Sequence, residues 1–170
     1  MERTQRRLQD VNIITSRFGM IQARDSDLIR MPEGLIGFRN YTQFVQLPDP
    51  EVAGLLWLQS ATAPDLAFGL VAPPLALCDY RIELRQGDLT ALELPDERSA
   101  LVYVILNRSE QGGLTVNLQG PLVFNPIRRL GRQLVLTSSR YAVRYPMSGT
   151  GLGQNPTLPM PVSAPLRASA

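Results

Sequence analysis

The sequence predicts an all-β fold, a small antiparallel β-barrel or bent β-sandwich of about ten to twelve short strands. The chain consists of short apolar runs, several of them rich in Val, Ile, Tyr and Phe, separated by Gly, Pro, Asn and Asp. No segment shows a long apolar period of 3.6 residues, so at most one or two short helical turns are expected. With 170 residues, of which 44% are hydrophobic and 19% charged, the chain has the composition of one globular domain.

Each strand is predicted from an apolar run that is bounded by turn residues. The candidate strands are Asn12–Arg17, Met20–Ala23, Leu28–Met31, Phe44–Leu47, Leu55–Gln59, Ala67–Val71, Arg81–Leu84, Leu101–Leu106, Thr115–Leu118, Leu122–Asn125, Gln133–Leu136 and Tyr141–Arg144.

Two loops and one segment stand out between these strands. Gln111–Gly113 predicts a hairpin turn, because glycine adopts a positive φ at little cost. The loop Asn125–Gly131 predicts a second hairpin, with Gly131 as its positive-φ residue. Asp88–Leu94 is the best helical candidate, since Asp88 can cap a first turn whose Leu89 and Leu92 share a face.

The chain divides into three segments. Residues 1–10 are predicted to be a flexible N-terminal segment; they carry three arginines and no apolar stretch, unlike a secretory signal. Residues 11–146 form the β domain, and residues 147–170 are a Gly/Pro-rich tail that we expect to be disordered. The span 66–78 is uncharged but holds only thirteen residues and is broken by Gly and Pro. A membrane helix needs about 20 apolar residues, so the sequence predicts a soluble, cytoplasmic protein with no membrane partner.

The residue inventory limits the chemistry. The chain has no histidine, its 17 basic residues are all arginine, and Cys78 is its one cysteine. A Ser-His-Asp or Cys-His system, a lysine Schiff base and a Cys/His zinc site therefore cannot be built from one chain. We expect a protein that is not an enzyme and carries no cofactor and no metal.

Three polar features have both a functional and a structural interpretation. Asp25-Ser26-Asp27 has ligands for a hard cation, but its place before a strand favours a turn. Asp96-Glu97 lies beside a proline and is most simply a solvated loop; a carboxylate pair acting on sugars stays an open alternative. Cys78 has an acidic neighbour, which disfavours a reactive thiol and favours a buried or half-buried structural cysteine.

The densest basic stretch contains Arg128, Arg129 and Arg132. Such a cluster suits phosphate binding, so a β-barrel that binds nucleic acid through these arginines is an alternative function. No aromatic residue lies among them to stack on bases, which favours a solvated hairpin that protects a sheet edge.

Charge is unevenly distributed along the chain. Residues 49–110 hold ten acidic residues and four arginines, whereas residues 111–170 hold six arginines and no acid. If the strands of each segment lie side by side, the molecule has an acidic and a basic region, which suits partner selection more than catalysis.

Several motifs, taken in order, resemble the flagellar assembly factor FliW family over about residues 13–146. They are Met31-Pro32-Glu33-Gly34-Leu35-Ile36-Gly37-Phe38, Trp57-Leu58-Gln59-Ser60, Pro64-Asp65-Leu66-Ala67-Phe68, Asp79-Tyr80, Val116-Asn117-Leu118, Gly120-Pro121-Leu122-Val123, Asn125, Gly131-Arg132-Gln133-Leu134-Val135-Leu136, Tyr141 and Arg144-Tyr145-Pro146. Three positions depart from the family pattern: Ile36 replaces a proline, Ala72 an asparagine and Tyr145 a histidine. These departures affect turn chemistry more than the fold.

The resemblance implies a regulator that acts through protein partners. FliW-like proteins bind the RNA-binding translational repressor CsrA and relieve its repression of flagellin mRNA; they also bind flagellin, as a chaperone-like partner that displaces CsrA. The family fold is a small β-barrel or bent sandwich. No direct contact with nucleic acid is expected, and the free protein is expected to be a monomer.

Some residues are candidates for partner contacts. The candidate partner-binding residues are Asn117, Asn125, Arg128, Arg132, Asp96 and Glu97. The two asparagines have an equally good structural interpretation, because an amide in an apolar strand must find hydrogen-bond partners. The run Leu55-Leu56-Trp57-Leu58 is apolar on both faces of a strand, which favours a core position for Trp57 over a binding hot spot.

As a mechanism, we hypothesise that an acidic surface of this protein, held near CsrA, repels RNA. The binding of RNA and of this protein to CsrA would then be reciprocally coupled.

Overall fold

The computed structural model describes residues 9–137 and 140–147. The predicted flexible segment 1–10 and tail 147–170 lie almost entirely outside these residues, so their flexibility stays a prediction. Within the described part, the first strand begins at Asp10 and the last ends at Met147.

Short strands account for most of the regular structure. The elements are β1 (Asp10–Thr15), β2 (Gly19–Arg24), η1 (Asp25–Asp27), β3 (Ile29–Arg30), β4 (Gln43–Pro48), β5 (Leu56–Ser60), β6 (Ala67–Val71), η2 (Pro73–Leu75), α1 (Gln86–Ala91), η3 (Glu97–Ser99), β7 (Leu101–Arg108), β8 (Leu114–Val116), β9 (Leu122–Asn125), β10 (Leu130–Gln133) and β11 (Tyr145–Met147), where η denotes a single 3-10 turn.

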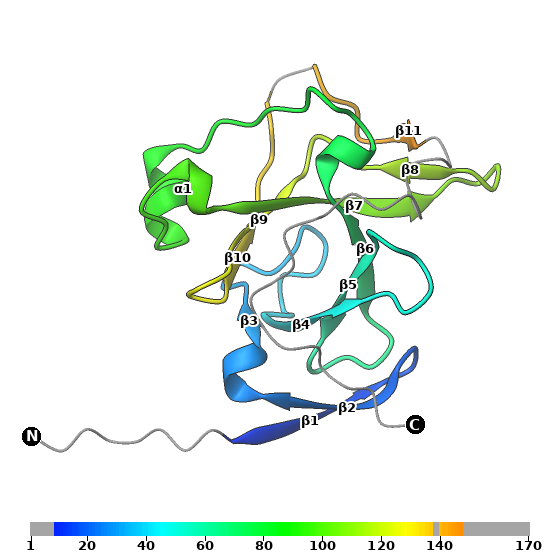
Figure 1. The fold of residues 1–170 in the computed structure, drawn as a ribbon, viewed down its shortest axis with the longest axis vertical. Coiled ribbons are helices and arrows are strands. Elements are labelled where there is room, and N and C mark those ends of the chain that lie inside the picture. Colours follow the sequence, from blue (N-terminus) through cyan, green and yellow to red (C-terminus); the bar gives the residue numbers. More distant parts are fainter. Residues whose placement is uncertain (1–8, 138–139, 148–170) are drawn as a thin grey trace, which may run out of the picture.

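Seven of these strands close into a barrel (Figure 1). The order β7-β6-β5-β4-β3-β10-β9 returns to its start because β7 also pairs with β9, through Leu101↔Phe124 to Tyr103↔Leu122. All neighbours are antiparallel except β3 and β10, which meet in parallel at one residue pair, Leu130↔Arg30. The strands β8 and β11 extend the sheet beyond β7. The predicted all-β barrel is thereby confirmed.

The barrel interior follows from the two-residue period of a strand. In β4, Phe44 points inward and is fully buried, whereas Val45 and Leu47 point to the opposite face. In β9, Leu122 and Phe124 join the same interior, while Val123 faces outward to another apolar layer. All four residues of β9 are buried because both of its faces are covered.

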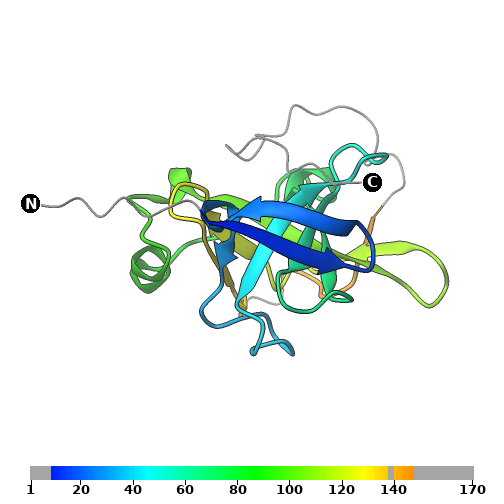
Figure 2. The same ribbon diagram turned by 90° about the horizontal axis from the view of Figure 1, so that it is seen from below.

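The hairpin β1–β2 packs across the outer side of the barrel at β4 (Figure 2). Its residues Ile13 and Ile21 are fully buried and pack with Val45 and Leu47 of β4. The hairpin therefore closes off the outer face of β4.

A second layer covers β9 and β10. The turn after α1 contributes Leu92 and Leu94, which pack on Val123, Leu130 and Leu134, and α1 itself contributes the partly buried Leu89. This contact holds α1 beside the β9–β10 hairpin (Figure 1).

The predicted strands agree with the structure where a run is apolar and locally paired. Ala67–Val71 and Leu122–Asn125 match β6 and β9 at both ends, and the helix predicted at Asp88–Leu94 overlaps α1. The strand predicted at Arg81–Leu84 is wrong, because side chains take its backbone amides: Arg81 N–H donates to the Tyr141 hydroxyl and Leu84 N–H to Glu97 Oε1.

A second predicted strand, Tyr141–Arg144, is also wrong. The pairing with β8 begins only at Tyr145, where Tyr145↔Val116 opens the β8–β11 ladder. Tyr141 instead packs its ring 4.6 Å from that of Tyr80 and donates its hydroxyl proton to the Arg81 carbonyl.

The two predicted hairpins form, but one turns on a different residue. Gly112 has φ +85°, as predicted for the β7–β8 turn. In the β9–β10 turn the left-handed residue is Arg129, with φ +55°, and the prediction for Gly131 is wrong. Gly131 lies within β10, where a Cβ atom would stand 2.7 Å from the Phe124 ring, so this position requires glycine for space.

Two further sequence interpretations need correction. Cys78 is exposed, not buried, and its Sγ lies 3.9 Å from the Pro74 carbonyl oxygen. Trp57 is half-buried: its Nε1–H donates to Asp49 at 2.8 Å and the Arg17 guanidinium lies 4.0 Å above its ring. Burial alone would raise the pKa of Asp49, but the hydrogen bonds from Trp57 and two backbone amides outweigh it, so the pKa lies below its ordinary value.

Candidate functional site

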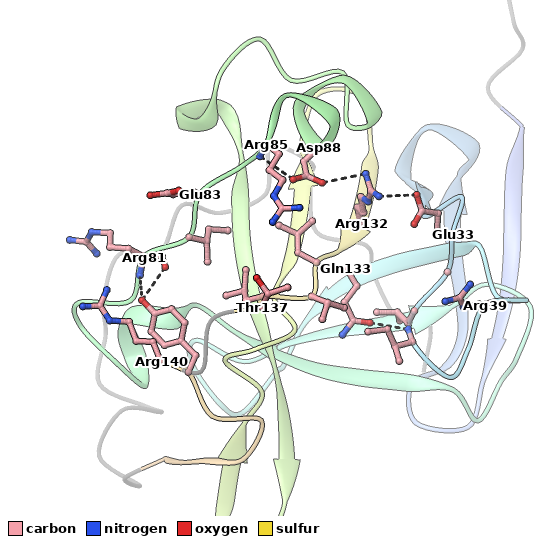
Figure 3. Close-up of a pocket in the computed structure, with 18 residues that line it drawn as sticks. Glu33, Arg39, Arg81, Glu83, Arg85, Asp88, Arg132, Gln133, Thr137 and Arg140 are labelled. Atoms are coloured by element: carbon pink, nitrogen blue, oxygen red, sulfur yellow. Dashed lines mark hydrogen bonds and ion pairs between the residues drawn. The ribbon is translucent and has the colours of Figure 1, made fainter.

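A groove of about 650 Å³ lies beside β10 (Figure 3). Three segments form its walls: the loop after β3, the extended chain that leads into α1, and the chain that continues from β10. The lining residues are Glu33, Gly34, Leu35, Ile36, Arg39, Arg81, Ile82, Glu83, Arg85, Asp88, Arg132, Gln133, Leu134, Val135, Leu136, Thr137, Arg140 and Tyr141.

The first wall is a tight loop set by two glycines. Gly34 has φ +62°, and a Cβ atom there would lie 2.6 Å from the Arg39 Cα, so the loop closes only with glycine. Gly37 has φ +84°. The loop buries Leu35, whereas Ile36 stays 56% exposed at the rim of the groove.

Aromatic residues anchor the far side of this loop. Phe38 packs edge-on against Phe68 with 5.2 Å between ring centroids, and Phe44 is fully buried in the barrel. Phe38 keeps 38% of its surface exposed, so it covers the core only in part.

Arg132 ties the first wall to α1. Its guanidinium lies 3.3 Å from Glu33 on the loop and 3.3 Å from Asp88 Oδ1 on the helix (Figure 3). The other oxygen of Asp88 accepts a hydrogen bond from the Arg85 backbone N–H. The loop after β3 and the helix α1 are thereby both linked to β10.

The third wall is the continuation of β10. Leu134 N–H donates to the Pro121 carbonyl and Leu136 N–H to the Gln119 carbonyl, which continues the β9–β10 register beyond Gln133. Gln133 also accepts from Ile36 N–H at 2.9 Å and donates to the Gly120 carbonyl at 3.2 Å. A proline at position 36 has no N–H to make the first of these bonds, so Ile36 adds a contact between loop and strand.

The other two departures from the expected motif have local effects. Ala72 precedes η2 without a side-chain cap, where an asparagine side chain would be able to accept a hydrogen bond. Tyr145 begins β11 and packs half-buried on the apolar cluster around Val104 and Val116.

The two candidate asparagines make internal hydrogen bonds. Asn125 is buried; its Nδ2 donates to the carbonyls of Leu92 and Glu93, and its Oδ1 accepts from the backbone N–H groups of Ile127 and Arg128. Asn117 is half-buried and its Oδ1 accepts from the N–H groups of the two residues that follow Leu118. This geometry favours their structural interpretation, and partner contact stays a prediction.

The arginines of the β9–β10 turn also have partners. Arg128 pairs with Glu93 at 3.1 Å and is 64% exposed. Arg129 donates to the Asp27 carbonyl; burial lowers the pKa of its guanidinium, and nearby Asp27 opposes that shift. With Arg132 bound to two carboxylates, the cluster is not the open phosphate-binding surface that a nucleic-acid interface requires.

The acidic candidates Asp96 and Glu97 make hydrogen bonds that hold the loop after α1 in place. Asp96 caps η3 by accepting from Ser99 N–H and Oγ–H, bonds that hold its pKa below the ordinary value. Glu97 accepts from Leu84 N–H at 3.1 Å. The cluster Asp25-Ser26-Asp27 forms η1, with Asp27 accepting from Arg24 N–H, which confirms the predicted turn.

The charge segments of the sequence interleave in space. The ion pairs Arg128–Glu93 and Arg132–Asp88 each join the basic segment 111–170 to the acidic segment 49–110. Strand β7 of the acidic segment also pairs with both β8 and β9 of the basic one. The expected separation into two regions does not hold around α1.

Within residues 9–137 and 140–147, no three His, Cys, Asp or Glu side chains come together as a metal site requires. None of the helices in the same residues is long and apolar enough to cross a membrane. The groove presents a mixed surface of arginine, carboxylate and exposed aliphatic side chains.

Of the candidate partner-binding residues predicted from the sequence, only Arg132 lines the groove. Arg39 lies far in the sequence from Arg81 and Arg85, and only the fold brings all three to the same groove. One signal was available, because the motif residues Glu33, Gly34 and Gln133 all line it.

The match to known proteins covers the whole barrel. The family model for the FliW protein matches residues 12–147. The chain belongs to the FliW family. Flagellar assembly factor FliW of Moorella thermoacetica is 34% identical over 152 residues, which are 88% of this chain and 96% of the relative. That of Geobacter sulfurreducens is 36% identical over 137 residues, 80% of this chain and 86% of the relative.

A solved structure agrees with the fold as well. A crystal structure of the flagellar assembly factor FliW aligns with a TM-score of 0.73 at 34% identity, covering 79% of this chain and 95% of that one. The solved structure therefore shows the same fold as this chain over most of its length.

Proposed function

We propose that this FliW-family protein is a cytoplasmic flagellar assembly factor that binds CsrA and flagellin. It antagonises the repression of flagellin mRNA by CsrA, and flagellin competes with CsrA for it as a chaperone-like client. The observation that carries the proposal is the family match over residues 12–147, together with relatives that are named flagellar assembly factors.

The side-chain arrangement supports action by binding. In the β9–β10 turn and the loop after α1, the carboxylates and arginines described above are engaged with one another or with backbone groups. Such groups hold loops in place, and the groove beside them offers a fixed surface to a partner.

The ion pairs argue against the mechanism hypothesised from the sequence, in which an acidic surface repels RNA. Because Glu93 and Asp88 are paired with arginines, the region around α1 is not a strongly acidic surface that would repel RNA. We propose instead that CsrA and flagellin compete for overlapping surface, so that flagellin releases CsrA by mass action.

The test is a titration of this protein into a complex of CsrA with flagellin leader RNA. The apparent affinity of CsrA for RNA should fall as the protein is added and recover when flagellin is added in excess. Unchanged RNA affinity at saturating protein overturns the CsrA proposal. Recovery that fails with flagellin, while CsrA is still sequestered, overturns the competition.

The nucleic-acid alternative is separated in the same experiment. Retention of labelled RNA by this protein alone, weakened steeply by salt and by Arg128→Gln, would favour direct binding. Arg128 is the suitable position because it is exposed and its replacement leaves the bonds of Arg129 and Arg132 in place.

A further inference from the structure

The chain from Gln133 to Thr137 has one paired edge and one open edge. Leu134 and Leu136 direct their N–H groups toward the chain before β9, so the main-chain groups of the residues between them point the opposite way, into the groove. Among the described residues, neither the N–H nor the C=O of Val135 has a hydrogen-bond partner.

Among the described residues, no strand pairs with this edge because β3 ends early. Arg30 N–H donates to the Arg129 carbonyl, and the next residue, Met31, already donates to Thr42 on the way to β4. From Gln133 on, the loop reaches β10 through a side chain, Gln133 Oε1 to Ile36 N–H. A strand of about five residues would find an unpaired neighbour there.

The side chains around the edge define what fits. Val135 is 65% exposed and Ile36 56%, which gives two apolar contacts beside the open backbone. The lining holds five arginines and three carboxylates, and two of those carboxylates, Glu33 and Asp88, are already bound to Arg132.

The arginines are spread along the groove. Figure 3 shows Arg39 at one end, Arg81 at the other and Arg85 above the strand between them. Charge complementarity therefore selects a ligand with carboxylates at more than one point along its length.

We propose that the Gln133–Thr137 edge binds an extended acidic segment of a partner protein as an added β-strand. The segment hydrogen-bonds Val135 N–H and C=O through its main chain, places an apolar side chain on Val135 and Ile36, and pairs its carboxylates with Arg39 and Arg85. This goes beyond the proposed function, since it concerns the mode of binding whether or not CsrA or flagellin supplies the segment.

The experiment uses the full chain and the fluorescein-labelled peptide Asp-Val-Ser-Val-Glu with blocked ends. Anisotropy gives the affinity, and amide NMR shifts locate the contact. We expect the Val135 amide to shift and to gain protection from exchange, and a matched peptide with Lys in place of Asp and Glu to bind at least tenfold more weakly. No binding of the acidic peptide at millimolar concentration, or equal binding of the basic one, overturns the proposal.

Two variant pairs separate backbone pairing from side-chain contact. Val135→Pro removes the amide donor but leaves the bonds of Leu134 and Leu136, and should weaken peptide binding at least tenfold; Val135→Ala keeps the donor and should weaken it less than threefold. Arg85→Gln should weaken binding severalfold and reduce its salt dependence, whereas Arg128→Gln, outside the groove, should not.

The controls keep these outcomes decisive. Unfolding midpoints verify that each variant is folded. If the Val135→Pro protein is not folded, a peptide methylated at its central main-chain nitrogens takes its place, because methylation removes the main-chain donors of the peptide. Equal binding of the methylated peptide overturns the β-strand mode. Protection of the Val135 amide without peptide, in a concentration-dependent dimer, overturns it in favour of a second copy of the chain. None of these arms contains CsrA or flagellin, so their failure is distinct from failure of the proposed function.

Discussion

Two consecutive stretches of the chain differ in whether their polar groups have hydrogen-bond or ion-pair partners. In the β9–β10 hairpin, Asn125 makes four hydrogen bonds, and Arg128, Arg129 and Arg132 each have a partner. A few residues later, Val135 offers a donor and an acceptor with no partner among the described residues. The conspicuous polar side chains therefore hold the framework together here, while an aliphatic residue marks the open surface.

The largest expected effect is at Asn125. Asn125→Ala leaves two carbonyls and two N–H groups without their partner at a buried position, so we expect a loss of about 3 kcal/mol in the free energy of unfolding. Urea denaturation measures it. Asn117→Ala is the matched control, because that amide is half-buried and bonds only two N–H groups; it should cost about 1 kcal/mol. Equal losses at the two positions would contradict the assignment of Asn125 to the framework.

The next effect concerns space within the hairpin. Gly131→Ala places a Cβ atom 2.7 Å from Phe124 and 3.1 Å from Met31, so overpacking should cost about 2 kcal/mol. Gly87→Ala is its control: no atom lies within 4 Å of the added Cβ, and alanine in α1 should stabilise by about 0.5–1 kcal/mol. Urea unfolding of both variants checks the opposite signs, and a stable Gly131→Ala protein would show that the Phe124 ring can move.

The hairpin also shows what sequence could predict. Local patterns suffice for β6, β9 and the β7–β8 turn, because alternation and glycine chemistry act over a few residues. The role of Gly131 was not predictable, since the demand for space comes from Phe124 across the ladder rather than from the turn.

The groove was harder to predict from the sequence than the strands. Its open edge exists because β3 is two residues long and β10 continues past it, a consequence of barrel closure that no local motif encodes. Arg81–Leu84 shows the same limit: its alternation suits a strand, but Tyr141 and Glu97, distant in sequence, take its amides.

A smaller effect on the free energy of unfolding is expected at Arg132 in β10, between the hairpin turn and Val135. Arg132→Ala removes a partly buried link between Glu33 and Asp88, so stability should fall by about 1 kcal/mol, more than an exposed pair would give. The measurement is again urea denaturation, now at low and at 1 M salt. A loss that disappears entirely in 1 M salt would contradict the partly buried character of the link.

The smallest effect is expected at Arg128. Its ion pair with Glu93 is exposed on both sides, so Arg128→Ala should change stability by less than about 0.5 kcal/mol. Because the fold hardly depends on it, this variant reports partner binding without a stability artefact. CsrA or flagellin affinity that falls with Arg128→Ala, while the Glu93→Gln protein binds as well as the unaltered one, would make Arg128 a contact residue. Unchanged affinity in both variants would confine the β9–β10 turn to the framework and leave the groove as the surface to which partners are to be mapped.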